Sequence, residues 1–411
     1  MFCVLIAIME IKTRWYGLLI GQHGGLLSDN FYHIDSTRID PPTKTSRQVS
    51  SLLPIALPAM LFSTFTSLAV ILGAGIPSLA CGINRAADQG PGPSLSLSRR
   101  HLRMSKRQTR PPGTDPLKTL RILNPYPGIF AYYDGRTGDR FHSDRSNWLD
   151  DGAFTLGVST YSIVSGDTAL LYDAAITESH AEAMITHLKS IGVTKTTTVY
   201  SHYHTDHVAG AGALQRAGTN FTGQELTVST LKRLAADYAA LDPPIPKVFP
   251  PTTTYKDVAT VQVGDRTVEM HHFHVHTTDG TVLYLPKEQI LFAGDTLEDT
   301  ATFIAEPDSI DTHVKELQRM ATLQIGKILP AHGSPDRIAA GGYGPEFINA
   351  TVRYLNAVNS PVARPPAWSQ KLQEVVKDDV AAGNLIYFAQ YEEVHQSNVQ
   401  SIRQVRRGGG Q

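Results

Sequence analysis

Cysteine is almost absent from this 411-residue chain, which contains only Cys3 and Cys81. Both lie in the N-terminal fifth of the sequence, far from the part whose pattern indicates a folded domain. A disulfide scaffold or a zinc finger needs several cysteines at defined spacings, and thiol catalysis needs a cysteine close to other reactive groups. The sequence therefore argues against all three.

A net charge of either sign is also missing. The 37 Lys and Arg residues nearly balance the 38 Asp and Glu residues and leave a formal charge of −1. No long-range field therefore draws nucleic acid or an anionic surface to the chain. Proteins that bind a phosphate backbone need clustered Lys and Arg, and no basic arm is evident within residues 118–360. We expect a small-molecule substrate and no nucleic-acid partner.

The overall composition is that of a globular enzyme, with 41% hydrophobic and 18% charged residues. The length is enough for two or three average domains of about 150 residues each. We divide the chain into an N-terminal extension, residues 1–117, a catalytic domain, residues 118–360, and a helical C-terminal extension with a polar tail, residues 361–411.

Residues 52–80 carry no charge, and this stretch is longer than the roughly 20 residues that cross a bilayer as a helix. More basic residues follow it than precede it, so a span would leave the C-terminal domain in the cytosol. An extension without a folded role is a second interpretation, because Met104 opens a segment suited to the start of a soluble protein, and a targeting segment is a third. We expect a cytoplasmic protein, with a membrane anchor through residues 52–80 as the alternative. Whether residues 1–103 belong to the mature protein stays open, as does the oligomeric state.

Short apolar strands alternate with amphipathic helices in the predicted catalytic domain. Turn residues between apolar runs predict two hairpins, and apolar positions at helical spacing predict two helices. The expected elements are hairpins over 154–172 and 282–292, helices over 178–191 and 314–321, and strands over 196–200 and 328–329.

The most informative segment follows the strand predicted at 196–200. It places four potential metal ligands within six residues, namely His202, His204, Asp206 and His207. A loop can turn several of these side chains toward one point, whereas a strand would send neighbours to opposite faces. Imidazole and carboxylate groups suit zinc or a similar transition metal. The segment therefore predicts a metal site on a loop that precedes a helix.

The pattern His202-x-His204-x-Asp206-His207 resembles the signature of the metallo-β-lactamase superfamily. The other motifs of that family follow at matching places in the sequence, in the order Asp173 before the signature and His276, Asp295 and His332 after it. The resemblance implies a fold of the α/β class, an αββα sandwich of two mixed β-sheets flanked by helices, with metals at one edge of the sheets.

The resemblance also implies a division of the ligands between two metal ions. One ion would be held by His202, His204 and His276, the other by Asp206, His207 and His332, with Asp295 and a water or hydroxide between them. Seven ligands are too many for one tetrahedral ion but suit two ions about 3.5–4 Å apart. Two Zn²⁺ ions are the expected cofactor, with iron or manganese as alternatives, and the number of ions stays open.

Other residues near these motifs have different roles. On family grounds Asp173 orients the metal loop rather than binding metal, and Asp206 and Asp295 are the candidate catalytic residues. His274 is left open as a ligand or as a residue that supports the ligands. His271 and His272 are expected to be solvated or packed.

The resemblance implies a hydrolase that uses a metal-bound hydroxide to cleave an ester, thioester, lactone or lactam bond. An aspartate at position 295 is nearer to the thioesterase, lactonase and glyoxalase II-like branches, because true β-lactamases usually carry cysteine or serine there. A persulfide dioxygenase-like enzyme with a single iron and a β-lactamase are the alternatives. The substrate cannot be read from the sequence, since specificity in this fold lies in loops.

Overall fold

The computed structural model describes residues 116–408. The predicted N-terminal extension, including the apolar stretch 52–80, lies outside the described residues except for its last two positions. Among the residues that are described, no helix combines the length and the apolar character needed to cross a bilayer.

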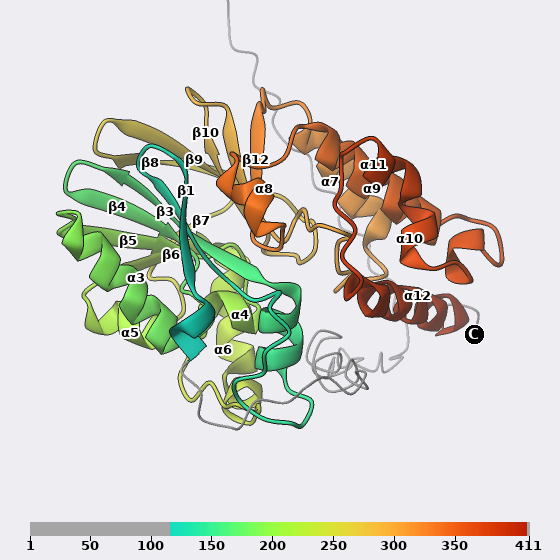
Figure 1. The fold of residues 1–411 in the computed structure, drawn as a ribbon, viewed down its shortest axis with the longest axis horizontal. Coiled ribbons are helices and arrows are strands. Elements are labelled where there is room, and N and C mark those ends of the chain that lie inside the picture. Colours follow the sequence, from blue (N-terminus) through green and yellow to red (C-terminus); the bar gives the residue numbers. More distant parts are fainter. Residues whose placement is uncertain (1–115, 409–411) are drawn as a thin grey trace, which may run out of the picture. The chain divides into compact units, whose positions relative to one another are not determined.

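Two mixed β-sheets form the centre of the described region (Figure 1). The first is antiparallel from β1 to β4 and parallel from β4 to β7. Its strands lie in the order β1 (Arg121–Tyr126), β2 (Ile129–Asp134), β3 (Val158–Ser165), β4 (Thr168–Tyr172), β5 (Lys195–Val199), β6 (Asn220–Gln224) and β7 (Thr253–Tyr255).

The second sheet has five strands and is antiparallel except for the parallel pair β11 and β12. Its spatial order is β12 (Lys327–Pro330), β11 (Ile290–Gly294), β10 (Thr281–Leu285), β9 (Arg266–His272) and β8 (Val258–Val263). The predicted hairpins correspond to β3 with β4 and to β10 with β11, and the two predicted single strands correspond to β5 and β12.

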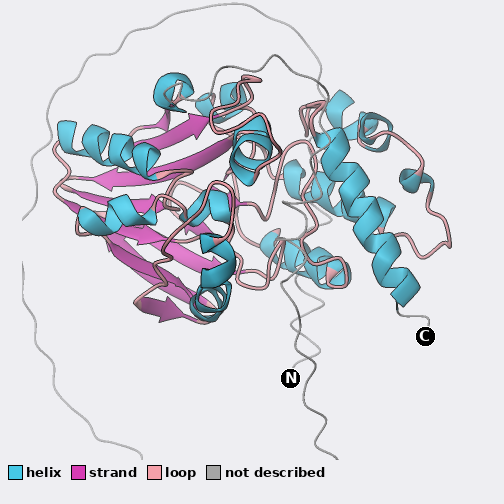
Figure 2. Ribbon diagram, turned by 90° about the horizontal axis from the view of Figure 1, so that it is seen from below, coloured by secondary structure: helices cyan, strands magenta, loops and turns pink. Residues whose placement is uncertain are grey.

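Helices cover the outer faces of the sheets, as Figure 2 shows. Those packed on the first sheet are α3 (Glu178–Ser190), α5 (Ala211–Arg216) and α6 (Glu225–Ala239), together with the π-helix η2 (Trp148–Phe154). Those packed on the second are α7 (Ile310–Met320), α9 (Glu346–Val358), α10 (Leu372–Val375) and α12 (Tyr391–Gly408). The shorter elements are η1 (Pro116–Thr119), α4 (Thr205–Val208), α8 (Pro335–Ala339), η3 (Pro366–Trp368) and α11 (Lys377–Ala381).

The strand β4 shows why the sheets become buried on both faces. Its side chains alternate in direction along the strand. Leu170 and Tyr172 enter the core between the two sheets, whereas Ala169 and Leu171 enter the core beneath the helices. The sequence of a strand that is buried on both faces is an almost continuous run of apolar residues. With a third core between the second sheet and its helices, the order of layers is the predicted αββα sandwich.

The C-terminal segment shares its core with the second sheet. Val394, Val399 and Ile402 of α12 pack in the same apolar cluster as Phe347 and Tyr354 of α9. Beyond residue 361 the described chain forms short helical turns and then the long α12, which continues to Gly408.

Candidate metal centre

The seven predicted ligands come from segments that follow strands. His202 and His204 lie in the turn after β5, and Asp295 directly follows the last residue of β11. His276 and His332 lie shortly beyond the ends of β9 and β12. The remaining two, Asp206 and His207, lie on α4, so the predicted loop contains a one-turn helix that the sequence analysis did not anticipate.

The structure brings all seven side chains together, and four of the histidines surround one carboxylate oxygen. Asp295 Oδ2 lies 3.2 Å from Nε2 of His207, 3.4 Å from that of His332, 3.5 Å from that of His202 and 3.6 Å from that of His276. Such an arrangement leaves several nitrogen lone pairs and an acidic oxygen facing a common space.

The cluster divides into two groups of potential ligand atoms that lie within 4.8 Å of one another. The first contains His202, His204, His276 and Asp295, and the second contains Asp206, His207 and His332. The resemblance implied the same two sets of three residues with Asp295 between them; here Asp295 falls in the first group and also contacts both histidines of the second. His204 and Asp206 are the two members that are not fully buried, so the cluster opens to solvent on their side.

The polar atoms of the cluster fit a cation. His202 Nε2, His204 Nε2 and Asp295 Oδ1 are buried without a hydrogen-bond partner in the protein. Nε2 of His276 and Nδ1 of His204 face each other at 2.9 Å. Buried polar groups without partners cost about 1–3 kcal/mol each. Imidazole and carboxylate ligands are those that zinc prefers, so a transition-metal ion would satisfy groups that the protein leaves unpaired.

Asp173 holds the metal loop in place. Its Oδ2 accepts a hydrogen bond from His207 Nδ1 at 2.8 Å, and its Oδ1 accepts one from the backbone N–H of Ser201 at 2.6 Å. Metal-binding histidines usually donate their second ring N–H in this way, which fixes the ring and directs its other nitrogen at the metal. Asp173 therefore orients His207 and does not face the shared space itself.

Backbone carbonyls orient two further rings. His332 Nδ1 donates to the carbonyl of Gly157 at 2.6 Å, and His276 Nδ1 donates to that of Phe303 at 3.0 Å. With Nδ1 as the donor, Nε2 of each ring faces Asp295 and is the nitrogen available to a metal. Neither carbonyl could be found by inspecting side chains, and so the sequence analysis missed both.

Glu298 is another residue that the sequence analysis missed. It is 2% exposed, its Oε1 lies 3.5 Å from His276 Nδ1, and it accepts a hydrogen bond from the backbone N–H of Phe303. Burial and the nearby carboxylate of Asp295 raise the pKa of Glu298 to about 8. It follows Asp295 by three residues, but without a histidine beside it the sequence offers no signal.

The carboxylates of Asp206 and Asp295 stabilise positive charge on the neighbouring histidines. Burial alone would lower the pKa values of His207 and His332, but Asp295 and Asp206 outweigh it and hold both well above the ordinary value. By contrast, burial together with His276 lowers the pKa of His204 to about 3. A metal ion would take over the stabilising role of the protons on His207 and His332.

The neighbouring histidines lie outside this group. His271 is buried and pairs with Glu269, and His272 Nε2 donates to the carbonyl of Thr278. His274, whose role the sequence left open, pairs with Glu306 rather than with the seven residues.

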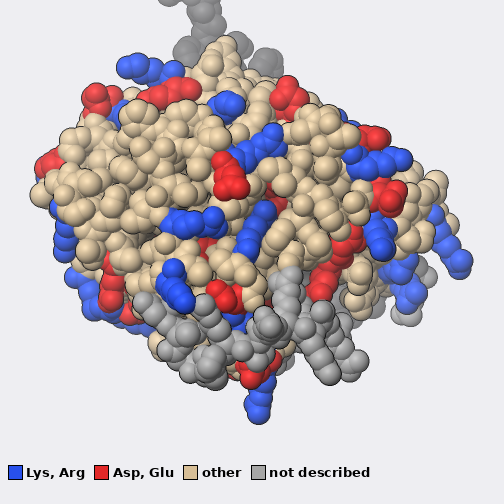
Figure 3. All heavy atoms as spheres, in the orientation of Figure 1, with Lys and Arg blue, Asp and Glu red and all other residues tan. Residues whose placement is uncertain are grey.

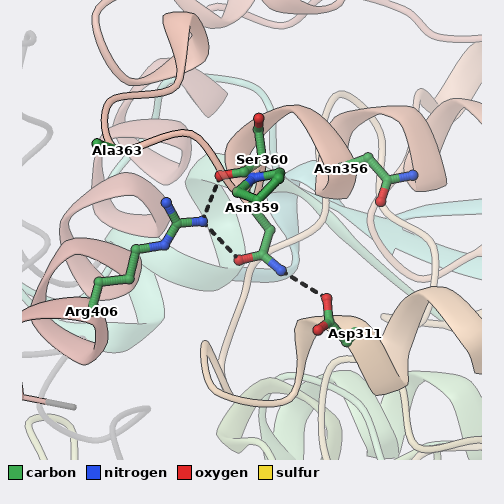
Figure 4. A pocket seen from close by; sticks show the side chains of 7 residues that line it. Asp311, Asn356, Asn359, Ser360, Ala363 and Arg406 are labelled. Carbon is green, nitrogen blue, oxygen red and sulfur yellow. Dashed lines mark hydrogen bonds between the residues drawn. The ribbon is translucent and has the colours of Figure 1, made fainter. Parts of the chain in front are cut away.

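The described region also has a charged surface and a hollow that lie apart from the seven residues. On the face seen in Figure 3, Lys and Arg are interspersed with Asp and Glu. A hollow between α7, α9 and α12 is lined by none of the seven residues (Figure 4). There Arg406 Nη2 donates to Asn359 Oδ1 and to the carbonyl of Ser360, and Asn359 Nδ2 donates to Asp311. These groups join the ends of the helices to one another.

The fold and the site define the class of protein, an αββα sandwich with histidine and aspartate ligands gathered at strand ends. Residues 153–332 match the model of the metallo-beta-lactamase superfamily, and this span includes all seven residues. The matched span is less than half of the chain, and it agrees with the family resemblance found in the sequence. The match indicates a metal-dependent hydrolase.

Curated proteins from two organisms are among those similar to the chain. "Metallo-beta-lactamase type 2" of Bacteroides fragilis is 25% identical over 210 residues, which are 49% of this chain and 77% of that protein. "Beta-lactamase-like protein 2 homolog" of Caenorhabditis elegans is 26% identical over 187 residues, 44% of this chain. The chain spans 58% of the length of the second protein.

Metallo-beta-lactamases of two bacteria are among the solved structures that match the chain. That of Pontibacter korlensis is 20% identical, with a TM-score of 0.44 and coverage of 58% of this chain and 99% of its own. That of Hirschia baltica is 16% identical, with a TM-score of 0.43 and coverage of 58% and 98%.

Proposed function

We propose that this protein is a dinuclear metallohydrolase that cleaves an ester, thioester, lactone or lactam bond of a small molecule. The observation that carries the proposal is the position of Asp295 Oδ2, within 3.6 Å of imidazole nitrogens from both ligand groups. A single oxygen shared by two sets of ligands is what a bridging carboxylate requires.

In this proposal His202, His204 and His276 hold one ion, and Asp206, His207 and His332 hold the other. Asp295 joins the two sets. Zn²⁺ is the proposed metal, with iron or manganese as alternatives, because nitrogen and carboxylate ligands admit all three. When bound, such a pair of ions supplies a nucleophilic hydroxide near neutral pH and polarises the carbonyl oxygen of the substrate.

The chain contributes orientation and proton acceptors. Asp206 and Asp295 are the carboxylates that face the shared space, and their oxygens orient the attacking water and accept its hydrogen bonds. Asp206 is the better placed to meet substrate, because its side chain retains 15% of its exposure while that of Asp295 retains 5%. Asp173, held at hydrogen-bond distance from His207, keeps the ring from rotating when substrate enters.

The second ligand group favours hydrolysis over the iron-dependent alternative. A persulfide dioxygenase-like enzyme would need one ion, which the group of His202, His204, His276 and Asp295 could hold alone. Here Asp206, His207 and His332 also converge, and His207 and His332 both contact Asp295. A two-metal site needs this second set of ligands, whereas a site for a single iron does not.

Among the carbonyl substrates, we place thioesters and lactones first because aspartate occupies position 295. Lactams are the second candidate, and the similarity to a protein named metallo-beta-lactamase type 2 favours them. For the N-terminal segment we propose a domain boundary near residue 118. Attachment to a membrane through residues 52–80 is the alternative to a cytoplasmic protein.

Metal analysis combined with a substrate panel tests the proposal. The purified protein is analysed by mass spectrometry for metals and assayed with p-nitrophenyl esters, a lactone, a thioester and a cephalosporin. We expect at least two ions per chain and hydrolysis of one carbonyl class. A single iron per chain, with oxygen consumption in the presence of a glutathione persulfide and no hydrolysis, would establish the redox alternative instead.

A further inference from the structure

A second cluster of potential metal ligands lies beside the first. It consists of His274, in the turn after β9, Glu306, in the segment before α7, and His313, on α7 itself. One ligand atom of each lies within 4.8 Å of the other two. His274 Nε2 is 2.6 Å from Glu306 Oε2, and the rings of His274 and His313 have centroids 5.4 Å apart. The turn after β9 and the segment 306–313 therefore present two imidazoles and a carboxylate to one place.

His313 is the member whose environment calls for a ligand. The residue is 2% exposed, and its Nε2 is buried without a hydrogen-bond partner in the protein. Leaving such a nitrogen unpaired costs about 1–3 kcal/mol, yet an apolar residue of similar size would fill the same space on α7 without this cost. Burial, and next the nearby His274, lower the pKa of His313 to about 3. The ring is therefore neutral at ordinary pH, which is the form that binds metals.

We propose that His274, Glu306 and His313 form an accessory binding site for a transition-metal ion, with Zn²⁺ as the ion of reference. Two histidines and one glutamate are a known three-ligand set for zinc, in which water completes the tetrahedron. The side chains of His274 and Glu306 are 26% and 19% exposed, so an ion and its water have access from solvent.

The distances are close to what an ion needs. Zinc–nitrogen and zinc–oxygen bonds of about 2.0–2.2 Å put neighbouring ligand atoms on a tetrahedral ion about 3.4 Å apart. The three ligand atoms lie within 4.8 Å of one another, so movements of about 1 Å bring them to that spacing. The present hydrogen bond between His274 and Glu306 would be exchanged for two bonds to the ion.

An ion at this site would stiffen the segment that orients a ligand of the first cluster. Glu306 Oε1 accepts a hydrogen bond from the backbone N–H of Thr278 at 3.0 Å. Three residues before Glu306, the carbonyl of Phe303 accepts the hydrogen bond of His276 Nδ1. The accessory ion would therefore join α7, the 303–306 segment and the turn that carries His276. In this arrangement it acts as a structural ion and not as a reactant.

The accessory site does not depend on the proposed hydrolase activity, because its test compares the metal content of variants. Metal-free protein is loaded with Zn²⁺, excess metal is removed, and bound zinc is counted per folded chain. We expect His313→Leu and Glu306→Gln each to hold about one ion fewer than the unaltered protein. His271→Asn is the matched control, because His271 forms a similar pair with Glu269 at 2.8 Å but has no second imidazole in a ligand cluster. It should bind as much zinc as the unaltered protein.

Each result has a clear meaning. Equal zinc content in the unaltered protein and in folded Glu306→Gln would overturn the accessory site, and this partly exposed position decides the matter if His313→Leu does not fold. His202→Ala separates the two clusters, because it should lose zinc from the first cluster while the additional loss caused by Glu306→Gln remains. If His202→Ala keeps all of its zinc while Glu306→Gln loses one ion, the first cluster fails and the accessory site stands.

Discussion

At the scale of single residues, the site depends on hydrogen bonds that fix which nitrogen of each ring faces the shared space. Asp173 combines two such tasks, because one oxygen holds His207 and the other holds the backbone N–H of Ser201. It also has a backbone φ of 75°, a conformation that asparagine adopts readily. Asp173→Asn therefore removes the charge and one acceptor with little change in the backbone.

We expect Asp173→Asn to weaken metal binding by roughly 10–100-fold, the usual effect of losing a residue that supports a metal ligand. Competition with a chromophoric chelator measures this affinity. Asp265→Asn, at an exposed position remote from the cluster in the hairpin turn between β8 and β9, is the control and should leave it unchanged. An affinity for zinc that is equal in both variants would show that His207 needs no partner.

The candidate ligands were predictable from the sequence because their chemistry is carried by the side chains themselves. His202, His204 and His207 are close together in the sequence, and the family pattern points to the more distant members. The supporting groups were not predictable, because the carbonyls of Gly157 and Phe303 could belong to any residue type. Glu298 is a side chain, but its position beside His276 depends on how the segment after β11 folds.

At the scale of elements, the end of β11 determines where Asp295 lies. The strand closes at Gly294, which has a φ of 54° and lies tightly against β4 and the metal loop. A Cβ on Gly294 would lie 2.8 Å from Tyr172 Oη and 2.9 Å from Ser201 Cβ. Only glycine fits this approach without a shift of its neighbours.

Gly294→Ala should lower the free energy of unfolding by about 1–3 kcal/mol, the usual cost of a strained backbone position, and should also reduce zinc content because Asp295 is displaced. Urea denaturation and metal analysis measure the two effects. Gly166→Ala has a similar φ of 58° but open space around its Cβ, so it should show the conformational cost without loss of zinc. If the two variants behave alike, close packing at Gly294 has no part in the site.

The helix α12 contacts the segment that orients His276 through the side chain of Asn398. This buried side chain accepts a hydrogen bond from the backbone N–H of Ile304 and donates to the carbonyl of Thr302, each at 2.9 Å. These residues flank Phe303, whose carbonyl orients His276. The C-terminal helices therefore support the segment behind the metal cluster.

Asn398→Ala should destabilise the fold by about 1–3 kcal/mol, because it leaves buried backbone groups without partners, and should weaken zinc binding as the 302–304 segment loosens. Thermal unfolding with and without zinc is the measurement. Gln400→Ala, at an exposed position of the same helix, provides the comparison. Destabilisation of similar size in both variants would assign the effect to the helix in general.

The long elements were predictable and the short one was not. Apolar residues at helical spacing gave α3 to within one residue at each end, since Ala181, Met184, Ile185 and Leu188 all face the sheet. The one-turn helix α4 has only four residues, too few for a periodic pattern to appear. Its formation depends on the tertiary contacts of Asp206 and His207.

At the scale of the whole molecule, buried acids outside the cluster make the stability depend on pH. Burial raises the pKa of Asp279 to about 6, although Thr227 and Thr277 donate hydrogen bonds to it. The unfolded chain would ionise this group near the ordinary value of 3.8. Because the folded state binds its proton more tightly, this contribution favours folding at low pH and is lost as pH rises from about 4 to about 6.

Asp279→Asn should remove that dependence. The free energy of unfolding of the unaltered protein, measured relative to the variant in urea, should fall between pH 4 and pH 6 by an amount of the order of 3 kcal/mol and then stay constant. A difference that is independent of pH over this interval, or that rises with pH, would contradict the assigned shift.

The αββα order of layers was predictable because the motifs identify the family and the alternating elements agree with it. The placement of the last helices on the second sheet was not, since amphipathic helices can cover any apolar surface. The proposed substrate is likewise not determined by the ligands, because the proposed metal centre would serve any carbonyl compound that reaches Asp206.

The most direct test of the central claim is the zinc content of His313→Leu protein with and without Asp295→Ala. The first substitution removes the accessory site, so the count refers to the seven residues alone. The account predicts about two zinc ions per chain with Asp295 present and loss of the second ion first when it is replaced, because both ligand groups share this carboxylate. Unchanged stoichiometry in folded Asp295→Ala protein would contradict it.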